Sequence, residues 1–460
     1  MKRFVCLFSI AAALTVVPSA SAATGALVSV GSPTGAHPQN ASNEPALAVD
    51  PVHPNILAAG SNDLVDTQPC SQQASTTAGA CSFPLGTFNL GVGLTGDYFS
   101  FDSGHTWVQP TYQGLTAADC DPTVEPCNAH VGPIHTVPNY YENGLRSRGD
   151  PGVAFGPAPG PNGFSWANGE RLYSSSLATS LTDDVIAKGS DTQNSTFAVT
   201  VSHIDNPSPA RIQVQSNWSQ PYFAATHVST SAGVDKEQVW ADNAASSRFF
   251  GNVYVCYVDF HSFSRGNNFP LKPMVATSTD GGLGQNNEKT MVSYSLDHGQ
   301  TWSTPTAVSL AGDRSAYSAP AIAPDGSAAY VVYMAFTQPF QTTTASPRPE
   351  HGVLLSSTLV GGVPTGWSPA YVGPTGDARG TSQGRILYNE FLGDYVYTVA
   401  TRTYGAGVWT DTRRTVDCPA MDAWRQASFT AGHRVFPAPW PLGDCPGAFG
   451  NDDIFSASTG

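Results

Sequence analysis

The sequence is poor in charge, since only 12% of its 460 residues are Asp, Glu, Lys or Arg. Basic residues are the scarcer kind, 21 against 35 acidic ones, which gives a formal net charge of −14. This negative balance argues against nucleic acid or an anionic membrane as the main partner. No stretch after the first 22 residues reaches the ~20 apolar residues that a membrane-spanning helix needs. Helical periodicity is nearly absent, so a mainly helical fold is excluded.

The first residues, "MKRFVCLFSIAAALTVVPSASAATG", have the layout of a secretory signal peptide. Lys2 and Arg3 form a basic start, an apolar run follows, and the small residues Ala20 to Ala22 end it. This pattern predicts a signal peptide over 1–22 and a mature domain over 23–460. We therefore expect a secreted, extracellular protein with a net charge of −16, because Lys2 and Arg3 leave with the leader.

Eight cysteines are present, and Cys6 lies in the predicted leader. Export permits disulfides. The spacings favour three pairs, namely Cys70–Cys81, Cys120–Cys127 and Cys418–Cys445. Cys256, in the apolar run "NVYVCYVDF", is expected to be a buried free thiol. The scattered spacing doesn't indicate a zinc site.

Short β-branched runs alternate with turns rich in Gly, Pro, Ser and Thr, which indicates an all-β protein. A strand–turn–strand unit recurs five times, at 43–63, 149–176, 235–260, 318–336 and 392–413. A third strand follows each unit. A fourth begins at a tryptophan in four copies: Trp107, Trp218, Trp302 and Trp367. The repeat predicts a β-propeller of four-stranded antiparallel blades. We count five blades, and a sixth would have to lie within 109–148.

The fifth copy ends the chain and lacks a fourth strand. We expect the mature N-terminus, "ALVSVGS" at 26–32, to complete it, because an unpaired blade edge would expose backbone hydrogen-bonding groups. Three Cys-rich or Pro-rich stretches, 64–90, 115–148 and 417–446, are expected to project as loop insertions.

Two turns are near copies of each other, "FSFDSGHTW" at 99–107 and "YSLDHGQTW" at 294–302. They resemble the Asp-box (BNR repeat) of the sialidase (neuraminidase) superfamily. The aspartate of such a turn can accept backbone N–H bonds, and the glycine permits a positive φ. In that family the box lies on an outer turn, away from the active centre, so the resemblance implies a structural role. The residues concerned are Asp102, Gly104, Trp107, Asp297, Gly299 and Trp302, with both tryptophans expected between neighbouring blades.

Aligning the five copies suggests which residues surround the mouth of the central channel. The aligned positions are Glu44, Asp150, Glu237, Ala319 and Asp394, with Lys236 and Tyr395 as neighbours. Crowded carboxylates raise one another's pKa unless a cation or ligand compensates. Two interpretations stay open: a mouth that binds a cation or sugar hydroxyls, or acids that bond to backbone N–H groups of adjacent blades. No cofactor is required, calcium is the candidate ion, and its ligands are unknown.

Working sialidases hold the substrate carboxylate with three arginines and use a tyrosine nucleophile backed by a glutamate. Here no arginine occurs between Arg3 and Arg146, and Glu44 lies where the first would be sought. The anion binders that remain are Arg148, Arg379, Arg385 and Arg413. Tyr388 and Glu390, in "LYNEFLGDY", are the candidate catalytic pair, with Arg413 as their partner. The alternatives are a structural tyrosine and an ion pair between Arg413 and a strand-end acid such as Asp411.

Sequence motifs of other enzyme classes are missing: there is no Gly-x-Ser-x-Gly elbow, phosphate loop or His-Glu-x-x-His. The first functional hypothesis is a secreted sialidase-like propeller that engages glycans at the channel mouth, as an exo-sialidase-like glycoside hydrolase. The alternative is a non-catalytic extracellular interaction scaffold with an acidic, cation-binding mouth. The expected partner is a glycan or an extracellular protein, with no nucleic acid and no membrane span.

Overall fold

The computed structural model describes residues 23–35, 37–70, 91–121, 123, 129–181, 196–228, 232–261, 288–382 and 387–460. The protein is all-β, as predicted, with antiparallel sheets and a few short helices. Within these ranges no helix is both long and apolar enough to cross a membrane.

The two ends of the chain meet in one four-stranded sheet. Its order is β1-β24-β23-β22, with bounds Thr24–Leu27, Asp453–Ser458, Gly405–Asp411 and Tyr397–Ala400. Thr24 pairs with Ser458 and Leu27 with Phe455. The prediction that the N-terminal strand completes the last sheet is confirmed, although the pairing begins two residues earlier than expected.

Three further sheets follow the predicted repeat. The first is β2 (Ser42–Val49), β3 (Leu57–Asp63) and β4 (Thr95–Ser100). The second contains β7 (Leu145–Ser147), β8 (Gly152–Gly160), β9 (Gly163–Ser180), β10 (Thr196–Asp205) and β11 (Tyr222–Val228). The third is β16 (Arg314–Ile322), β17 (Ala328–Phe336), β18 (Pro349–Val360) and β20 (Ser368–Val372), with short β19 (Val363–Pro364) and β21 (Gly376–Asp377) beside β18.

The remaining strands form pairs. They are β12 (Ala232–Ala241) with β13 (Val253–His261), β14 (Met291–Val292) with β15 (Thr306–Ala307), and β5 (Tyr112–Thr116) with β6 (His130–Ile134). The described residues also contain 3-10 turns at Tyr141–Asn143, Gln215–Asn217 and Ala378–Gly380. The predicted insertion at 115–148 therefore carries strands of its own.

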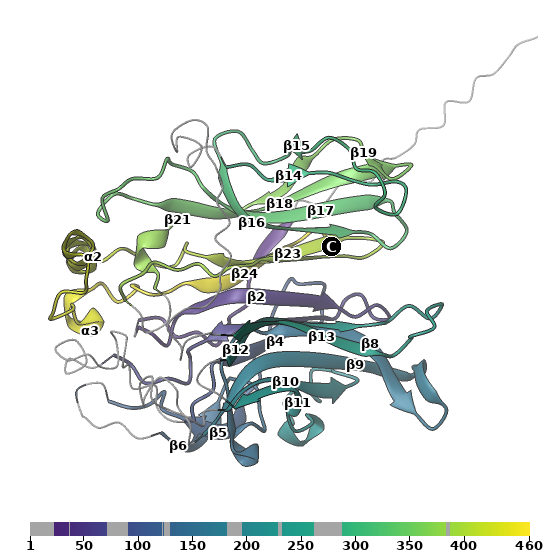
Figure 1. Cartoon of the computed structure of the whole chain (residues 1–460), viewed down its shortest axis with the longest axis horizontal. Coiled ribbons are helices and arrows are strands. Elements are labelled where there is room, and N and C mark those ends of the chain that lie inside the picture. The colour runs from purple at the N-terminus through teal and green to yellow at the C-terminus, as the bar shows by residue number, and fades with distance from the viewer. Residues whose placement is uncertain are drawn as a thin grey trace, which may run out of the picture.

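Buried apolar clusters join each sheet to the next. Val332 and Leu354 of the β16–β18 sheet pack with Trp409 of β23. Another cluster joins the β22–β24 sheet to the β2–β4 sheet, and two more join β2–β4 to β8–β10 and β8–β9 to β12–β13. Figure 1 shows the same succession from top to bottom: β16–β18, then β23 and β24, then β2, then β8 to β10. Strands such as β17 (AAYVVYMAF) are buried on both faces because a sheet lies on either side.

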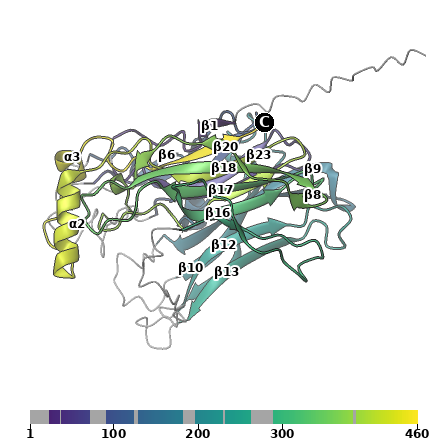
Figure 2. The ribbon, with the colours of Figure 1, turned by 90° about the horizontal axis from the view of Figure 1, so that it is seen from above.

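The third repeat is divided, because β12–β13 packs on β8–β9 whereas β14–β15 packs on β17–β18. The series is therefore an arc whose ends are the β12–β13 pair and the β14–β15 pair. Figure 2 shows β12 and β13 reaching away from β18 and β23. In the part of the chain that the structure describes, no apolar cluster joins the β12–β13 pair to the β16–β18 sheet. Successive sheets are thus established, whereas closure into a full ring is part of the proposal below.

The two copied turns have one hydrogen-bonding scheme. In the first, Asp102 accepts from Thr106 N (2.9 Å) and Thr106 Oγ1 (2.6 Å), while Ser100 Oγ accepts from Gly104 N at 2.9 Å. The second turn repeats these contacts with Asp297, Thr301, Ser295 and Gly299, at 2.9, 2.6 and 2.8 Å. Both glycines have positive φ, 89° and 83°. These bonds lower the pKa of Asp297 to about 2, chiefly through the Thr301 hydroxyl. This geometry supports a structural role for both aspartates.

The tryptophans of the two turns differ. Trp107 is buried between sheets and donates from Nε1 to Ser456 Oγ of β24 at 3.1 Å. Trp302 is 64% exposed and donates only to Gly299 O within its own turn. The prediction of inter-sheet packing is correct for Trp107 and wrong for Trp302, whose side chain belongs to no apolar cluster of the described residues.

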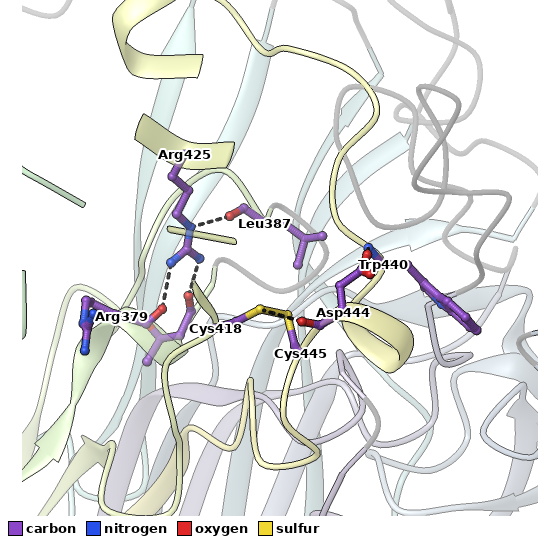
Figure 3. Close-up of a disulfide and its surroundings, with 8 residues drawn as sticks. Arg379, Leu387, Cys418, Arg425, Trp440, Asp444 and Cys445 are labelled. Atoms are coloured by element: carbon purple, nitrogen blue, oxygen red, sulfur yellow. Dashed lines mark hydrogen bonds between the residues drawn. A yellow bond between two sulfur atoms is a disulfide. The ribbon is translucent and has the colours of Figure 1, made fainter. Parts of the chain in front are cut away.

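The insertion at 417–446 is helical rather than a loop. It holds α2 (Pro419–Ala431) and α3 (Pro441–Asp444), at the left edge of Figure 1. The predicted Cys418–Cys445 disulfide is present (Figure 3). Buried Arg425 of α2 donates to the carbonyls of Leu387, Arg379 and Thr381 at 2.7–2.8 Å, which ties the helix to the segment beside the cleft described below.

The other cysteine predictions have mixed outcomes. Cys70 and Cys120 are each disulfide-bonded, and their predicted partners Cys81 and Cys127 lie outside the described residues. Cys256 is an exposed free thiol, so the expectation of a buried one is wrong. It lies on the face of β13 that points away from the neighbouring sheet, and an apolar run doesn't reveal which face is covered.

Candidate functional site

Equivalent positions in the five repeats share a rare backbone conformation. Four residues that are not glycine have positive φ there, namely Glu44 (54°), Asp150 (51°), Lys236 (57°) and Tyr317 (47°). The fifth position is Gly393, with φ 85°. Strand registers shift at this point in β2, β12 and β16, as expected of β-bulges. Strained bulges of this kind re-aim side chains and are typical of functional sites.

The bulge corrects the sequence alignment. Glu44 and Asp150 take the expected place, but Lys236 replaces Glu237, Tyr317 replaces Ala319 and Gly393 replaces Asp394. A bulge adds a residue to one strand of a pair. Alternation in the sequence therefore cannot locate it. The five bulge positions therefore do not form a ring of acids, because a lysine, a tyrosine and a glycine take three of them.

The ammonium of Lys236 is the centre of the site. Its Nζ lies 3.0 Å from Asp394 Oδ2, 3.3 Å from Glu44 Oε1 and 3.4 Å from Asp150 Oδ2. Asp235 lies slightly farther away, at 3.8 Å. The same Nζ is 5.2 Å from the centre of the Tyr395 ring, a cation–π contact. The structure thus brings together five predicted site residues: Glu44, Asp150, Lys236, Asp394 and Tyr395.

Glu44 is held on both carboxylate oxygens. Asn62 Nδ2 donates to Oε2 at 2.7 Å, and the backbone N–H of Asp394 donates to Oε1 at 3.2 Å. A Cβ added to Gly393 would lie 2.6 Å from Glu44 Cγ, so only glycine fits at that position. These contacts join β2 to the segment before β22.

The acidic groups around Lys236 have pKa values that differ from their ordinary ones. Burial, with the charge of Asp150, raises the pKa of Glu44 to about 8. Burial and a hydrogen bond with Asp150 raise the pKa of Asp235 to about 7. Burial alone would also raise the pKa of Asp150, but the hydrogen bond from Asp235 and the charge of Lys236 lower it. Near neutral pH the cluster therefore holds an ionised Asp150 between two protonatable acids.

Glu237 has a different environment from the one predicted. It is fully buried behind the mouth, and neither carboxylate oxygen has a hydrogen-bond partner in the described chain. Burial raises its pKa well above the ordinary value, and the charge of Asp150 adds to that effect. Burial of this kind disfavours the charged form of the carboxyl group.

A calcium ion doesn't fit at the centre of this cluster. Ca²⁺ needs six to eight oxygen ligands at 2.3–2.6 Å. Lys236 Nζ already occupies the point where the three carboxylates converge, at 3.0–3.4 Å. The ammonium of Lys236 therefore supplies the positive charge that these carboxylates need.

A cleft of about 510 Å³ opens beside the cluster, between β16 and the segment before β22. Tyr317 and Gly393 line the cleft and also occupy two of the five bulge positions. Its apolar wall consists of Phe336, Pro339, Phe340, Pro347, Ala378, Phe391 and Leu392. Its polar lining is Glu288, Arg314, Gln338, Arg348 and Glu390. This combination of aromatic wall and few polar groups is typical of ligand sites.

Two arginines of the cleft were not predicted. Arg314 donates from Nη1 to Gly312 O at 2.8 Å, and Arg348 pairs with Glu390. The Nε atoms of both arginines make no hydrogen bond with the described part of the chain. Arg314 begins the innermost strand of the fourth repeat, so a search for arginines at strand starts would have found it.

The candidate catalytic residues lie apart. Tyr388 packs edge-on against Trp424 at 6.1 Å, and Glu390 lies in the cleft. Arg413 is held by Asp411 at 2.7 Å, the predicted ion pair, and stacks on Phe455. Arg379 is paired with Asp377 and Asp422, Arg148 lies half-buried beside Leu177, and Arg385 is outside the described residues. Of these candidates, only Glu390 lines the cleft.

Comparisons with known proteins give remote structural likenesses only. No family model and no curated protein matches the chain. A protein of unknown function from Dyadobacter fermentans is 10% identical, with 94% of this chain and 97% of that chain covered and a TM-score of 0.27. An N-acetylgalactosamine deacetylase from F. plautii is 13% identical, with 95% of each covered and a TM-score of 0.29. Trypanosoma rangeli sialidase is 13% identical, covered over 81% of this chain and 44% of that one, with a TM-score of 0.23.

Proposed function

We propose that the protein binds an acidic sugar unit of a glycan in the cleft beside Lys236. The observation that carries this proposal is the pairing of an aromatic wall with two arginines in one 510 Å³ cleft. A pyranose can pack its C–H face on Phe336, Phe340 or Phe391. A carboxylate or sulfate group can accept hydrogen bonds from Arg314 and Arg348, since guanidinium groups suit such oxyanions.

Binding is favoured over hydrolysis by the arrangement of the acids. Paired carboxyl groups of glycosidases are about 5–9.5 Å apart, with the scissile bond between them. Here Glu44 and Asp150 both lie within 3.4 Å of Lys236 Nζ, which fills the space between them. Tyr388 lies against Trp424, outside the cleft lining, so it supports no nucleophilic role there.

We further propose that the arc closes as a five-bladed propeller of the sialidase-like Asp-box type, and that the protein is secreted after cleavage at Ala22. Five repeats in the sequence, two aspartate turns with the same hydrogen bonds and the β1–β24 pairing support the ring. The Cys418–Cys445 disulfide is compatible with an extracellular setting. N-terminal sequencing of protein exported by a heterologous host should begin at Ala23; an intact Met1 would contradict the export.

Arg314→Ala is expected to weaken binding of an acidic glycan at least about tenfold, because one charge-assisted hydrogen bond is lost. A glycan array would select the ligand, and calorimetry would measure its Kd. Arg248→Ala is the matched control, because Arg248 is exposed and lies outside the cleft. Equal losses in both variants would contradict a binding site in the cleft. Turnover of a fluorogenic sialoside by the wild type would contradict binding without hydrolysis.

A second candidate function, an extracellular interaction scaffold, is favoured by one surface. The face of β12–β13 that points away from β8–β9 exposes Trp240, 73% accessible, directly opposite Tyr254. This face is free only if the arc stays open, so the scaffold is an alternative to the closed ring. Aromatic residues of this kind are enriched in protein interfaces. A glycan array without signal, together with loss of partner binding in Trp240→Ser, would favour the scaffold over the glycan site.

The stability of the wild type is expected to fall between about pH 5 and pH 8. The pKa of Glu44 is raised to about 8 in the folded state, from 4.5. The folded state therefore binds more protons than the unfolded state in this window, and the stabilisation is lost as pH rises. Glu44→Gln should flatten this decline by at least about 1 kcal/mol at pH 8, measured by urea denaturation across pH. Exposed Glu142→Gln is the control; an unchanged slope in Glu44→Gln would contradict the assignment.

A further inference from the structure

A second cluster of side chains, all of metal-ligand type, lies at the opposite end of β2 from Glu44. Asp50 and His53 belong to the turn between β2 and β3, and Glu170 belongs to β9 of the neighbouring sheet. Six residues of strand separate Asp50 from Glu44, roughly 20 Å at the usual rise per residue. The cluster is therefore separate from the cleft and has no part in the proposed glycan site.

The ligand-type atoms of the three residues converge on one point. His53 Nδ1 lies 3.3 Å from Asp50 Oδ2 and 3.4 Å from Glu170 Oε1, and all three atoms are within 4.8 Å of one another. Two ligand atoms bound tetrahedrally at about 2.0–2.1 Å from Zn²⁺ are about 3.4 Å apart. The observed separations match that spacing. They exceed the usual hydrogen-bond length of about 2.9 Å, and one ring nitrogen cannot serve two acceptors well.

The two carboxyl groups are buried and, within the described residues, form no ion pair with a lysine or an arginine. The side chains of Asp50 and Glu170 are 0% and 9% exposed, whereas His53 is 52% exposed. The adjacent Arg171 is bound to Asp205, on the other face of β9. Two carboxyl groups this close repel each other when both are ionised, and His53, which contacts both, carries a charge only when it is protonated. A divalent ion would remove this repulsion, and His53 leaves an entry path from solvent.

The surrounding backbone orients both acids. Asp50 Oδ1 accepts from Val52 N at 2.8 Å and His53 N at 3.1 Å, which turns Oδ2 toward the imidazole. The backbone N–H and C=O of Glu170 are both bound by Asn206. Hydrogen bonds of this kind hold the ligand side chains in position before an ion binds.

We propose that Asp50, His53 and Glu170 bind a divalent transition-metal ion, Zn²⁺ or Mn²⁺, that fastens the β2–β3 turn to the β8–β10 sheet. The donor set of one imidazole and two carboxylates suits these ions better than Ca²⁺, which takes oxygen ligands only. Three protein ligands leave at least one coordination position for water. Because the three residues come from two sheets, the bound ion would link the first repeat to the second.

The test uses the whole mature protein, stripped with a chelator and titrated with ZnCl₂, MnCl₂ and CaCl₂ by calorimetry. The expected result is one Zn²⁺ or Mn²⁺ per chain, a rise in Tm on loading, and at least tenfold weaker binding in His53→Ala and Glu170→Gln. His53→Ala should fold, since this side chain is half exposed. X-ray absorption of the Zn²⁺ form should show a single imidazole and no sulfur.

Two control variants separate this site from adventitious binding. His130→Ala removes another exposed histidine near a carboxylate, 3.5 Å from Asp119, and Cys256→Ser removes the exposed thiol. Neither should change the affinity. The proposal is overturned if the stripped wild type binds no transition-metal ion stoichiometrically, or if His53→Ala and Glu170→Gln bind as tightly as the wild type.

Discussion

Removal of residues 23–29 is expected to lower the free energy of unfolding by at least about 4 kcal/mol. The deletion takes away β1, which forms the outer edge of the last sheet. It also removes Val28, which is fully buried and donates its N–H to Ile454 O, and Ser29, whose hydroxyl donates to Asp453 at 2.9 Å. The bared edge of β24 would then be open to pairing with other chains. Urea denaturation measures the loss, and light scattering detects the association.

A point variant and its control test the contribution of this segment without a deletion. Val28→Ala should cost about 1–2.5 kcal/mol, because it leaves a cavity in the cluster between the β2–β4 and β22–β24 sheets. Val30→Ala is the matched control, two residues away and 40% exposed, and should change stability by less than about 0.5 kcal/mol. An unaltered melting curve after the deletion would show that β1 is dispensable.

The second large effect concerns the two copied turns. Trp107→Ala should destabilise the protein by about 3–5 kcal/mol, the usual cost of truncating a buried aromatic side chain. The loss includes the hydrogen bond to Ser456 of the adjacent sheet. Trp302→Ala, at the same position of the second turn, should cost less than about 1 kcal/mol, since its side chain is 64% exposed.

The contrast between these variants is the informative quantity, because sequence context and turn geometry are shared. Denaturant unfolding of both variants should give clearly different midpoints with similar slopes. A loss at Trp302 as large as that at Trp107 would contradict the exposed position of Trp302.

Much of the fold could be predicted from the sequence because its signals are local. Strand–turn–strand repeats, the aspartate turns and the spacing of Cys418 and Cys445 are each contained within a few tens of residues. The pairing of β1 with β24 was also predictable, since only the last repeat lacked a strand. Helix α2 was missed because Pro-rich and Gly-rich flanks favoured a loop, whereas Arg425 and the disulfide stabilise the helix through tertiary contacts.

The candidate site was predicted only in part, for a physical reason. Glu44, Asp150, Lys236, Asp394 and Tyr395 were found because acids recur at strand starts. The bulges that put Tyr317 and Gly393 at the mouth leave no alternation signal, so these positions were missed. Arg348 and Glu390 are 42 residues apart and meet only through the packing of two sheets. Pairs of this kind cannot be read from one sequence.

The adjacency of the two chain ends has a consequence for the order of folding. Thr24 and Ser458 face each other across one ladder, so β1 is synthesised long before its partner β24 and cannot pair until β24 is present. Contacts of such high sequence separation are slow to form, because a long loop must close first. A circular permutant that joins Gly460 to Ala23 through a short linker, and opens in an exposed turn, should therefore keep the native structure and acquire its final sheet earlier.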